Sequence, residues 1–567
     1  MTAAVLRKTG RGRDWQAIPF LVGLLGVGLI LLFVRLDDAY LWQDEAETAL
    51  VSRHLLSYGL PLSTDGSDWV QQHSEPFVEF TRDHVWIYHS WLQYALTAAS
   101  FALLGPTTLA ARLPFAIAGL ATVVLVYVFA ARWLMDRPTA CVAAVLLLFC
   151  IPFVLLMRQS RYYALAALFT LLTLDAYLRL FHHVVTQPTV AKAWLVPYFV
   201  LSATLLYHSH YGAFFPTMIA LLLDLLTHRR WAVRFGRVWF VSSMLFIALL
   251  VFPWALYMRV WDRGQPLQLD RFVGHLGQHA VYATGWLWPL LLIPLGDVVY
   301  RWLTVAVLQR PRGRATARKR MQVAATLAFA RTAVMVIAVN ILFLSAGAAF
   351  DWVFFRYWTH LIPLLFILLA IVVVWIVQRR PMLGYALLAV LLACNILHLV
   401  PYGLPGIKDW DPSALWPTSP AFQALSEVWD KAGRFRSDLW MYAQELTHDY
   451  EGPNEGLVAY LSAHAQPGQT VAVNYEDLPL MFYSELRVLG GLSAHGLSAE
   501  AQPDWVINRK HGPYGELLMS IVESGRYERI EIPYPDIRWE NRPQPGEHHY
   551  LTVQDEDPVV LYRRQGD

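Results

Sequence analysis

The amino-acid sequence predicts a polytopic α-helical membrane protein with about 11 transmembrane helices and a C-terminal soluble α/β domain. Hydrophobic residues make up 56% and aromatic residues 14% of the 567 positions, far above the apolar content of an ordinary soluble domain. Many of these residues form runs of about 20, the length that crosses the hydrocarbon core of a bilayer. From Pro401 onward Pro, Gly, Asp and Trp become frequent, and no run reaches that length.

A further apolar run, from Trp91 to Leu104, is shorter, ends at Gly105-Pro106 and follows the polar pair Asp83-His84. Short apolar runs are more typical of interfacial helices than of spans, so we predict a juxtamembrane helix on the membrane surface here. The runs that we predict to span the membrane cover approximately 17–36, 113–131, 139–157, 162–181, 194–208, 210–227, 237–258, 281–303, 322–348, 358–377 and 382–400.

The basic residues orient these predicted spans. When 91–104 is not counted as a span, the basic positions fall on the same side as the basic N-terminus: Arg132, Arg137, 228–230, 310–320 and 378–380. The positive-inside rule makes that side cytoplasmic. The first run shows no small-residue cleavage pattern, so we predict a retained helix rather than a signal peptide.

This topology divides the chain into a transmembrane domain, 1–400, and an external domain, 401–567. The first external loop, about 37–112, is long and rich in carboxylates and histidines. No Asn-x-Ser/Thr sequon occurs, which fits a bacterial setting. We predict a multi-pass protein of the bacterial inner membrane, with a cytoplasmic N-terminus and a periplasmic or extracellular C-terminal domain.

Charge and cysteine content argue against some classes of function. The formal net charge of +2 is too small to predict a nucleic-acid partner, and the arginine-rich block 310–320 is most simply a cytoplasmic topology determinant. Cys141, Cys150 and Cys394 all lie in apolar runs, without the spacing of a disulfide framework or a metal site.

The external domain alternates helical and strand-like patterns, which predicts a small α/β sheet domain. No Gly-rich phosphate loop follows its first strand, so we predict no nucleotide site. The expected elements are helices near 421–448, 455–465, 478–484 and 515–524, and strands near 470–474, 487–489 and 505–508.

The segment Trp42–Glu47, directly after the first span, carries three carboxylates and has two interpretations. Asp44 and Glu47 have the spacing of a capping box before a helix at 46–57. A carboxylate at a helix start in a water-accessible cavity can also accept a proton from an attacking hydroxyl, and ionisable residues at membrane depth are often functional. We predict Asp44 as the general base, Glu45 as a partner that adjusts the base or binds a cation, and Glu47 as a supporting group.

Arginines at external helix ends are the expected ligands of an anion. Arg158, Arg161 and Arg356 can snorkel towards lipid headgroups, but topology selects against basic residues on the external side. A guanidinium binds phosphate oxygens bidentately, so we predict a phosphate-binding role for them. Tyr357, beside Arg356, is a further phosphate ligand in this prediction.

Histidines of the external loops give weaker signals. His208 and His210 are possible site residues with two interpretations, the capping of a tight turn and a metal site, but a spacing of two turns their rings to opposite faces in an extended segment. We therefore predict no metal site there. His73 and His84 receive no role from the residue pattern alone.

Several of these segments together resemble the family 39 glycosyltransferases of the GT-C fold, relatives of the protein O-mannosyltransferases and of the aminoarabinose transferase that modifies lipid A. The resemblance covers roughly residues 17–400. The segments that carry it are Trp42-Gln43-Asp44-Glu45-Ala46, Arg112-Leu113-Pro114, Arg158–Tyr163, and Arg356-Tyr357 followed by Pro363.

The resemblance implies a polyprenyl-phosphate-linked sugar donor, inversion at the anomeric carbon, and a first-loop aspartate as general base. Asp44 would be that base, Glu45 its neighbour, Arg112 the first-loop arginine, predicted to contact the donor phosphate, and Arg356 with Tyr357 the pair near that phosphate. Some relatives carry a lysine before the second juxtamembrane helix, whereas this chain has no Lys between Lys8 and Lys192. Arg82 or His84 would have to substitute for it.

These observations predict a glycosyltransferase acting on a hydroxyl of a glycan, lipid or protein at the external membrane face. No cofactor is required for this reaction, although a divalent cation is compatible with it. One alternative is a transporter or flippase of a lipid-linked sugar, which also needs many spans and basic residues. Another is a binding module on a membrane anchor. The charged groups gather on one face rather than at mid-bilayer, and so many spans exceed what an anchor needs.

Overall fold

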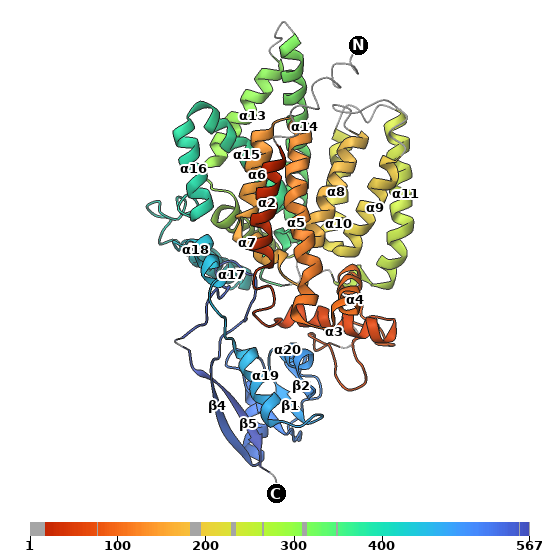
Figure 1. Ribbon diagram of the computed structural model, residues 1–567, viewed down its shortest axis with the longest axis vertical. Helices are drawn as coiled ribbons and strands as arrows, with labels where there is room; N and C mark the ends of the chain where they lie inside the picture. The colour runs from red at the N-terminus through yellow and green to blue at the C-terminus, as the bar shows by residue number, and fades with distance from the viewer. Residues whose placement is uncertain are drawn as a thin grey trace. The chain divides into compact units, whose positions relative to one another are not determined.

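The computed structural model describes residues 17–75, 78–181, 194–227, 234–263, 266–308, 314–347, 350–554 and 556–565 (Figure 1). The basic N-terminal residues 1–16, the segment 228–230 and residues 309–313 of the basic block lie outside these ranges. The chain forms two compact units. The helical unit comprises Met1–Val34, Ala116–Met157 and Tyr163–Trp440, and the mixed unit comprises Arg35–Phe115, Arg158–Tyr162 and Met441–Asp567.

The helical unit contains a bundle of roughly parallel long helices, together with helices that run in other directions (Figure 1). Its principal helices are α2 (Ala17–Phe33), most of α5 (Thr108–Trp133), α6 (Arg137–Leu148), α7 (Ile151–Met157), α8 (Tyr163–Phe181), α9 (Leu195–Ser209), α10 (Tyr211–Thr227), α11 (Arg234–Tyr257), α12 (Leu269–Tyr282), α13 (Leu292–Leu308), α14 (Arg314–Gly347), α15 (Ile362–Arg379), α16 (Pro381–Ala393) and α17 (Pro420–Ala432).

Among the described residues, five helices are long and apolar enough to cross a membrane, namely α5, α8, α11, α14 and α15. Two further predicted spans are bent helix pairs: α6 with α7, bent by 68°, and α12 with α13, bent by 86°. Four more predicted spans are the shorter helices α2, α9, α10 and α16, of 13 to 17 residues. The chain is therefore a polytopic helical membrane protein, and the number eleven stays a prediction.

Prolines account for the two bends. Pro152 is the second residue of α7, and Pro289 follows the extended residue Trp288, where the helix before α13 ends. A proline donates no backbone hydrogen bond and biases the preceding residue away from the helical conformation. The continuous spans predicted at 139–157 and 281–303 are therefore broken. The run 382–400 is also shorter than predicted, because α16 ends at Ala393.

The mixed unit contains a five-stranded sheet with the strand order β2-β1-β3-β5-β4. β1 pairs in parallel with β2 and β3, whereas β5 pairs antiparallel with β3 and β4. Its elements are α3 (Gln43–Tyr58), α4 (Leu92–Leu104), most of α18 (Asp438–Glu445), α19 (Pro453–His464), β1 (Thr470–Val473), α20 (Asp477–Tyr483), β2 (Arg487–Gly490), β3 (Trp505–Ile507), α21 (Gly515–Ser524), β4 (Tyr527–Pro535) and β5 (Pro558–Arg564).

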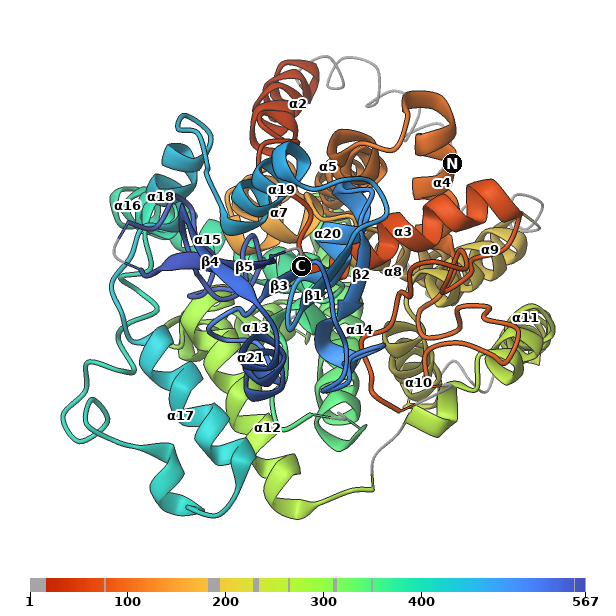
Figure 2. The ribbon, with the colours of Figure 1, turned by 90° about the horizontal axis from the view of Figure 1, so that it is seen from below.

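The structure differs in two respects from the helices and strands predicted for residues 401–567. The single helix predicted at 421–448 is two helices, α17 and α18, separated at Gly433. α17 lies alongside α12 in the helical unit (Figure 2), where Gly274 and Gly277 leave room for Ala421 and Leu425. The predicted set also lacks β4 and β5, so the small sheet is larger than the pattern indicated.

One hydrophobic core joins the first external loop to the C-terminal segment within the mixed unit. It contains Leu50 of α3 and Trp86 of the loop together with Val471 of β1 and Ile507 of β3. The compact units thus group residues 35–115 with 441–567, whereas the predicted boundary at residue 400 marks the end of the last apolar run. That boundary stays a prediction about membrane placement.

Candidate active site

Helix α3 places the carboxylates of the segment Trp42–Glu47. The helix begins at Gln43, and Trp42 is its extended N-cap residue, without a side-chain cap hydrogen bond. The capping-box interpretation of Asp44 is therefore wrong, because Asp44 lies inside the first helical turn rather than at the cap. The positive end of the helix dipole favours carboxylates in this turn.

Glu45 is completely buried and bound bidentately by Arg112. Arg112 Nε donates to Glu45 Oε1 at 2.9 Å, Nη2 donates to Oε2 at 2.7 Å, and the backbone N–H of Ser160 donates to Oε1 at 2.7 Å. The remaining N–H groups of Arg112 donate to the backbone carbonyl oxygens of Leu36, Ala39 and Tyr40. All five guanidinium hydrogens are thus used, which favours a structural role for Arg112 over the predicted phosphate contact.

Arg161 lies between the other two carboxylates of the segment. Its Nη1 donates to Glu47 Oε1 at 2.6 Å and to Thr48 Oγ1 at 3.2 Å, and its Nη2 is 3.7 Å from Asp44 Oδ2. The side chain of Arg161 is only 3% exposed, whereas that of Asp44 is 13% exposed. The structure therefore brings Asp44, Glu47 and Arg161 together, with Asp44 on the accessible side.

Glu47 is 1% exposed and surrounded by hydrogen-bond donors. Tyr94 Oη donates to Glu47 Oε1 at 2.9 Å, and Gln72 Nε2 donates to Glu47 Oε2 at 2.8 Å. Burial raises the pKa of Glu47 above its ordinary value, and the positive charge of Arg161 opposes this rise. Glu47 is thus a partner in a closed network rather than a group that substrate reaches.

A second carboxylate orders the loop that supplies Gln72. Glu79 Oε2 accepts from the backbone N–H groups of Gln72 and His73, at 2.8 and 3.1 Å, and Glu79 Oε1 is 2.9 Å from His73 Nδ1. Glu79 itself is buried. These contacts hold the backbone from which the Gln72 amide reaches Glu47, so His73 and Glu79 gain a positioning role that the sequence pattern did not show.

His89 completes the surroundings of Arg161. The Nη2 of Arg161 is 2.9 Å from His89 Nε2, and a guanidinium is only a donor, so this contact requires His89 Nε2 to accept. The residue pattern did not assign a role to His89, Gln72 or Tyr94, because they lie in an irregular loop and in α4 rather than in the carboxylate segment.

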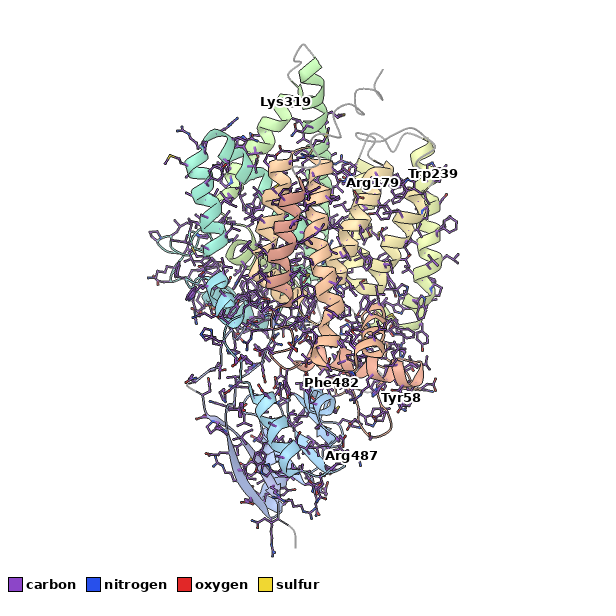
Figure 3. All side chains as sticks on the ribbon, viewed as in Figure 1. Tyr58, Arg179, Trp239, Lys319, Phe482 and Arg487 are labelled. Carbon is purple, nitrogen blue, oxygen red and sulfur yellow. The ribbon has the colours of Figure 1, made fainter. Side chains whose placement is uncertain are left out.

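The C-terminal segment holds the start of α3 through α20. Gln43 Nε2 donates to Asp477 Oδ1 at 2.8 Å, and the backbone N–H of Leu41 donates to Tyr483 Oη at 2.9 Å. Burial raises the pKa of Asp477 to about 7, and the hydrogen bond from Gln43 opposes this rise. Phe482 of α20, labelled in Figure 3, stacks on Phe101 of α4. Residues more than 400 positions later in the chain therefore fix the carboxylate segment.

The remaining predicted residues of the mixed unit lie apart from this network. Arg158 donates from Nη2 to the backbone oxygen of Arg35 at 2.8 Å, and its guanidinium lies 5.8 Å from the ring centroid of Tyr442. Arg82 is exposed, and the ring of His84 packs edge-on against Trp69. In the described part of the chain, neither Arg82 nor His84 forms a hydrogen bond or ion pair with the three carboxylates of α3.

Four predicted residues belong to the helical unit. Arg356 and Tyr357 lie in the short 3-10 helix Phe355–Trp358 between α14 and α15, and the guanidinium of Arg356 is 4.2 Å from the ring centroid of Phe354. Their phosphate role stays a prediction.

His208 lies in the last turn of α9 and His210 is the extended C-cap residue of that helix, and their rings lie against those of Trp254 and Tyr211 respectively. Within the described ranges, no group of three or more His, Cys, Asp or Glu side chains is arranged to hold a metal ion.

No protein-family model and no curated protein matches the sequence. Among solved structures, the chain is similar to ArnT from Cupriavidus metallidurans bound to undecaprenyl phosphate, with a TM-score of 0.56 and 13% identity over 97% of this chain and 98% of that one. The apo structure of the same ArnT gives a TM-score of 0.56 and 14% identity over 96% and 98%. This likeness shows the GT-C fold and confirms the fold that the resemblance predicted.

Proposed function

Taking the GT-C fold as the premise, we propose that the chain is an inverting glycosyltransferase with Asp44 as its general base. It would move a sugar from a polyprenyl-phosphate-linked donor to a hydroxyl of a glycan, lipid or protein at the external face of the bacterial inner membrane. The undecaprenyl phosphate bound by ArnT supports this class of donor. The observation that carries the proposal is the unequal exposure of three neighbouring carboxylates.

Exposure and hydrogen bonding separate the roles of these carboxylates. Glu45 is saturated by Arg112 and by the Ser160 N–H, and Glu47 is enclosed by Tyr94, Gln72 and Arg161. Asp44 has the most exposed side chain of the three. A general base must come within hydrogen-bond distance of the proton that it removes, so Asp44 is the carboxylate that an acceptor hydroxyl can approach.

The proposed reaction is a single displacement. The acceptor hydroxyl gives its proton to Asp44 while its oxygen bonds to the anomeric carbon, and the bond from that carbon to the phosphate oxygen breaks. The electron pair leaves with the phosphate, so the products are a glycoside of inverted configuration and polyprenyl phosphate. The protein needs a base on one side of the anomeric carbon and positive charge on the other.

The arginines divide between these two tasks. Arg112 and Arg161 act as positioning residues, because both are buried among carboxylates of α3. Arg356 and Tyr357, with Arg158, are the proposed ligands of the donor phosphate, and planar guanidinium groups suit phosphate oxygens. A divalent cation remains compatible with the reaction, and activity in EDTA tests whether one is needed.

The test uses purified full-length protein in proteoliposomes with a panel of undecaprenyl-phosphate-linked sugars. Released undecaprenyl phosphate and new glycoside are both measured. Asp44→Asn should lower turnover at least about 100-fold without changing thermal stability, because general-base catalysis typically contributes 10²–10⁴-fold. Asp83→Asn, an exposed carboxylate of the same loop, should keep wild-type activity.

Near-normal turnover of Asp44→Asn would remove Asp44 from the role. Movement of the labelled donor across the bilayer without release of undecaprenyl phosphate would instead support the transporter alternative.

A further inference from the structure

The helical unit contains a cavity of about 280 Å³ to which the proposed reaction assigns no role. The ends of α5, α6 and α15 and parts of α13 and α14 enclose it. Figure 3 labels Lys319, one of its lining residues, near the tip of α14. The polar lining consists of Asp136, Thr139, Lys319, Gln322, Thr326 and Gln378.

This cavity is far from the proposed phosphate ligands of the helical unit. Thr326 lines the cavity, and α14 continues from there to Gly347, just before the segment that carries Arg356. At about 1.5 Å per helical residue, this part of α14 is roughly 30 Å long. The cavity therefore lies at the opposite end of α14 from Arg356 and is a separate place in the unit.

The helix ends around the cavity carry the residues that mark the cytoplasmic membrane interface. Arg132, Arg137 and Arg379 lie at or near the ends of α5, α6 and α15. The guanidinium of Arg379 is 4.3 Å from the ring centroid of Trp375, which also lines the cavity. Basic residues and tryptophans gather where spanning helices reach lipid headgroups. The cavity thus opens at the predicted level of the cytoplasmic headgroups.

The lining is rich in hydrogen-bond donors and amphipathic. The ammonium of Lys319 and the amides of Gln322 and Gln378 supply donors, whereas Val323 and Val374 give the lining apolar, buried surface. The carboxylate of Asp136 is already engaged, because its Oδ2 accepts from the backbone N–H and the hydroxyl of Thr139 at the start of α6. Donors beside apolar surface match a phosphodiester attached to a glycerol.

We propose that this cavity binds the phosphodiester headgroup of a phospholipid from the cytoplasmic leaflet, with Lys319 at the phosphate. The lining carries one cation, Lys319, and one carboxylate, Asp136, and the positive charge in excess comes from Arg132, Arg137 and Arg379 at the surrounding helix ends. Basic pockets between membrane helices on the cytoplasmic side are suited to such headgroups. Pockets that enclose a drug-sized ligand measure about 300–1,000 Å³, so this smaller cavity holds a headgroup and leaves the acyl chains in the bilayer. The proposal is independent of the glycosyl transfer.

The test is a lipid titration of the purified, delipidated full-length protein, with bound lipid counted by native mass spectrometry. Dioleoyl phosphatidylglycerol is compared with dioleoylglycerol, which has the same chains but no phosphate. We expect at least about tenfold tighter binding of the phospholipid, corresponding to about 1.4 kcal/mol. Lys319→Gln should weaken phospholipid binding about tenfold, and Gln378→Leu should weaken it less.

Lys408→Gln, an exposed lysine elsewhere in the helical unit, is the matched control and should bind like the wild type. Lys319 and Gln378 are exposed, so their variants should fold normally, and thermal unfolding checks this. Equal binding of the two lipids, or unchanged binding in Lys319→Gln, overturns the proposal. Retention of the lipid in excess inorganic phosphate supports a headgroup site, whereas displacement by inorganic phosphate shows a site for the free anion and overturns the lipid assignment.

Discussion

Two arginines of the mixed unit, Arg509 and Arg161, each lie between two carboxylates. The two clusters differ in whether solvent can reach one of those carboxylates. Arg509 Nη1 donates to Glu476 Oε2 at 2.7 Å, and its Nε donates to Asp536 Oδ1 at 2.6 Å. Arg161 makes one contact of 2.6 Å, to Glu47, but lies 3.7 Å from Asp44. The Arg509 cluster is buried on every side, whereas the Arg161 cluster leaves Asp44 accessible.

The same three charges therefore differ in accessibility between the two clusters, and the proposed function assigns chemistry only to the cluster that leaves a carboxylate accessible. In the Arg509 cluster both carboxylates are buried, so substrate does not reach their oxygens, and removing the arginine from such a cluster is strongly destabilising. A carboxylate held at a longer distance and partly exposed keeps an oxygen for a new partner. Exposure, rather than the presence of an arginine, distinguishes the two clusters.

The largest expected effect is a loss of stability when the arginine of the Arg509 cluster is removed. Arg509→Met should destabilise the mixed unit by about 3 to 5 kcal/mol, because Glu476 and Asp536 stay buried without their cation. Thermal and urea unfolding of the purified protein measure the change. Arg529→Met, an exposed arginine of β4, should stay within about 0.5 kcal/mol of the wild type. A loss under 1 kcal/mol in Arg509→Met would contradict the structural role.

Arg161→Lys should produce a smaller effect, and on activity rather than on folding. Lysine keeps the charge but cannot bridge Glu47, Asp44 and His89 with one planar group, so we expect a loss of roughly 10- to 100-fold in kcat, about 1.4 to 2.8 kcal/mol. Release of undecaprenyl phosphate measures it. Arg487→Lys, exposed on β2, is the control. Wild-type kcat in Arg161→Lys would show that Arg161 does not position Asp44.

The stability of the mixed unit should also depend on pH. Burial raises the pKa of Glu540, near Glu476, to about 8, above its ordinary value of 4.5. The folded protein therefore binds this proton more tightly than the unfolded chain, so its contribution to stability is complete below about pH 4.5 and is lost as the pH rises through about 8. Asp477, with a pKa of about 7, acts in the same direction.

We therefore expect the Tm of the wild type to fall between pH 5 and pH 8, and the fall to be clearly smaller in Glu540→Gln. Glu523→Gln, an exposed glutamate of α21, should show the wild-type fall. An identical fall in Glu540→Gln and the wild type would mean that Glu540 does not titrate in this range.

The smallest expected effect on activity comes from Gln72, which contacts Glu47 of the Arg161 cluster. Gln72→Leu removes the amide that donates to Glu47 Oε2, which we expect to lower kcat a few-fold and stability by about 1 kcal/mol. Gln466→Leu, at an exposed position of the same unit, should leave both unchanged. A loss as large as that of Arg161→Lys would place Gln72 in the catalytic constellation itself.

Much of the fold and part of the candidate site could be predicted from the sequence. Long apolar runs indicate membrane helices because the bilayer fixes their length. The acidic segment Trp42–Glu47 was predicted to contribute carboxylates to the site from the residue pattern alone. The bends at Pro152 and Pro289 and the end of α16 were missed, because hydropathy measures apolar length and not helix continuity. β4 was missed because it is largely exposed, with only Ile532 buried, and because it contains Pro533 and Pro535, which weaken a strand pattern; β5 was missed with it.

The sequence by itself determined a polytopic membrane protein, the strands and helices around β1 to β3, and the acidic segment that opens α3. Only the tertiary structure decided which carboxylate is accessible, because Arg112, Arg161 and Asp477 approach α3 from other parts of the chain. Burial and hydrogen-bond saturation are properties of such long-range contacts, and a local pattern carries neither. Three neighbouring carboxylates therefore look equivalent in the sequence, and packing alone leaves the Asp44 side chain more exposed than those of Glu45 and Glu47.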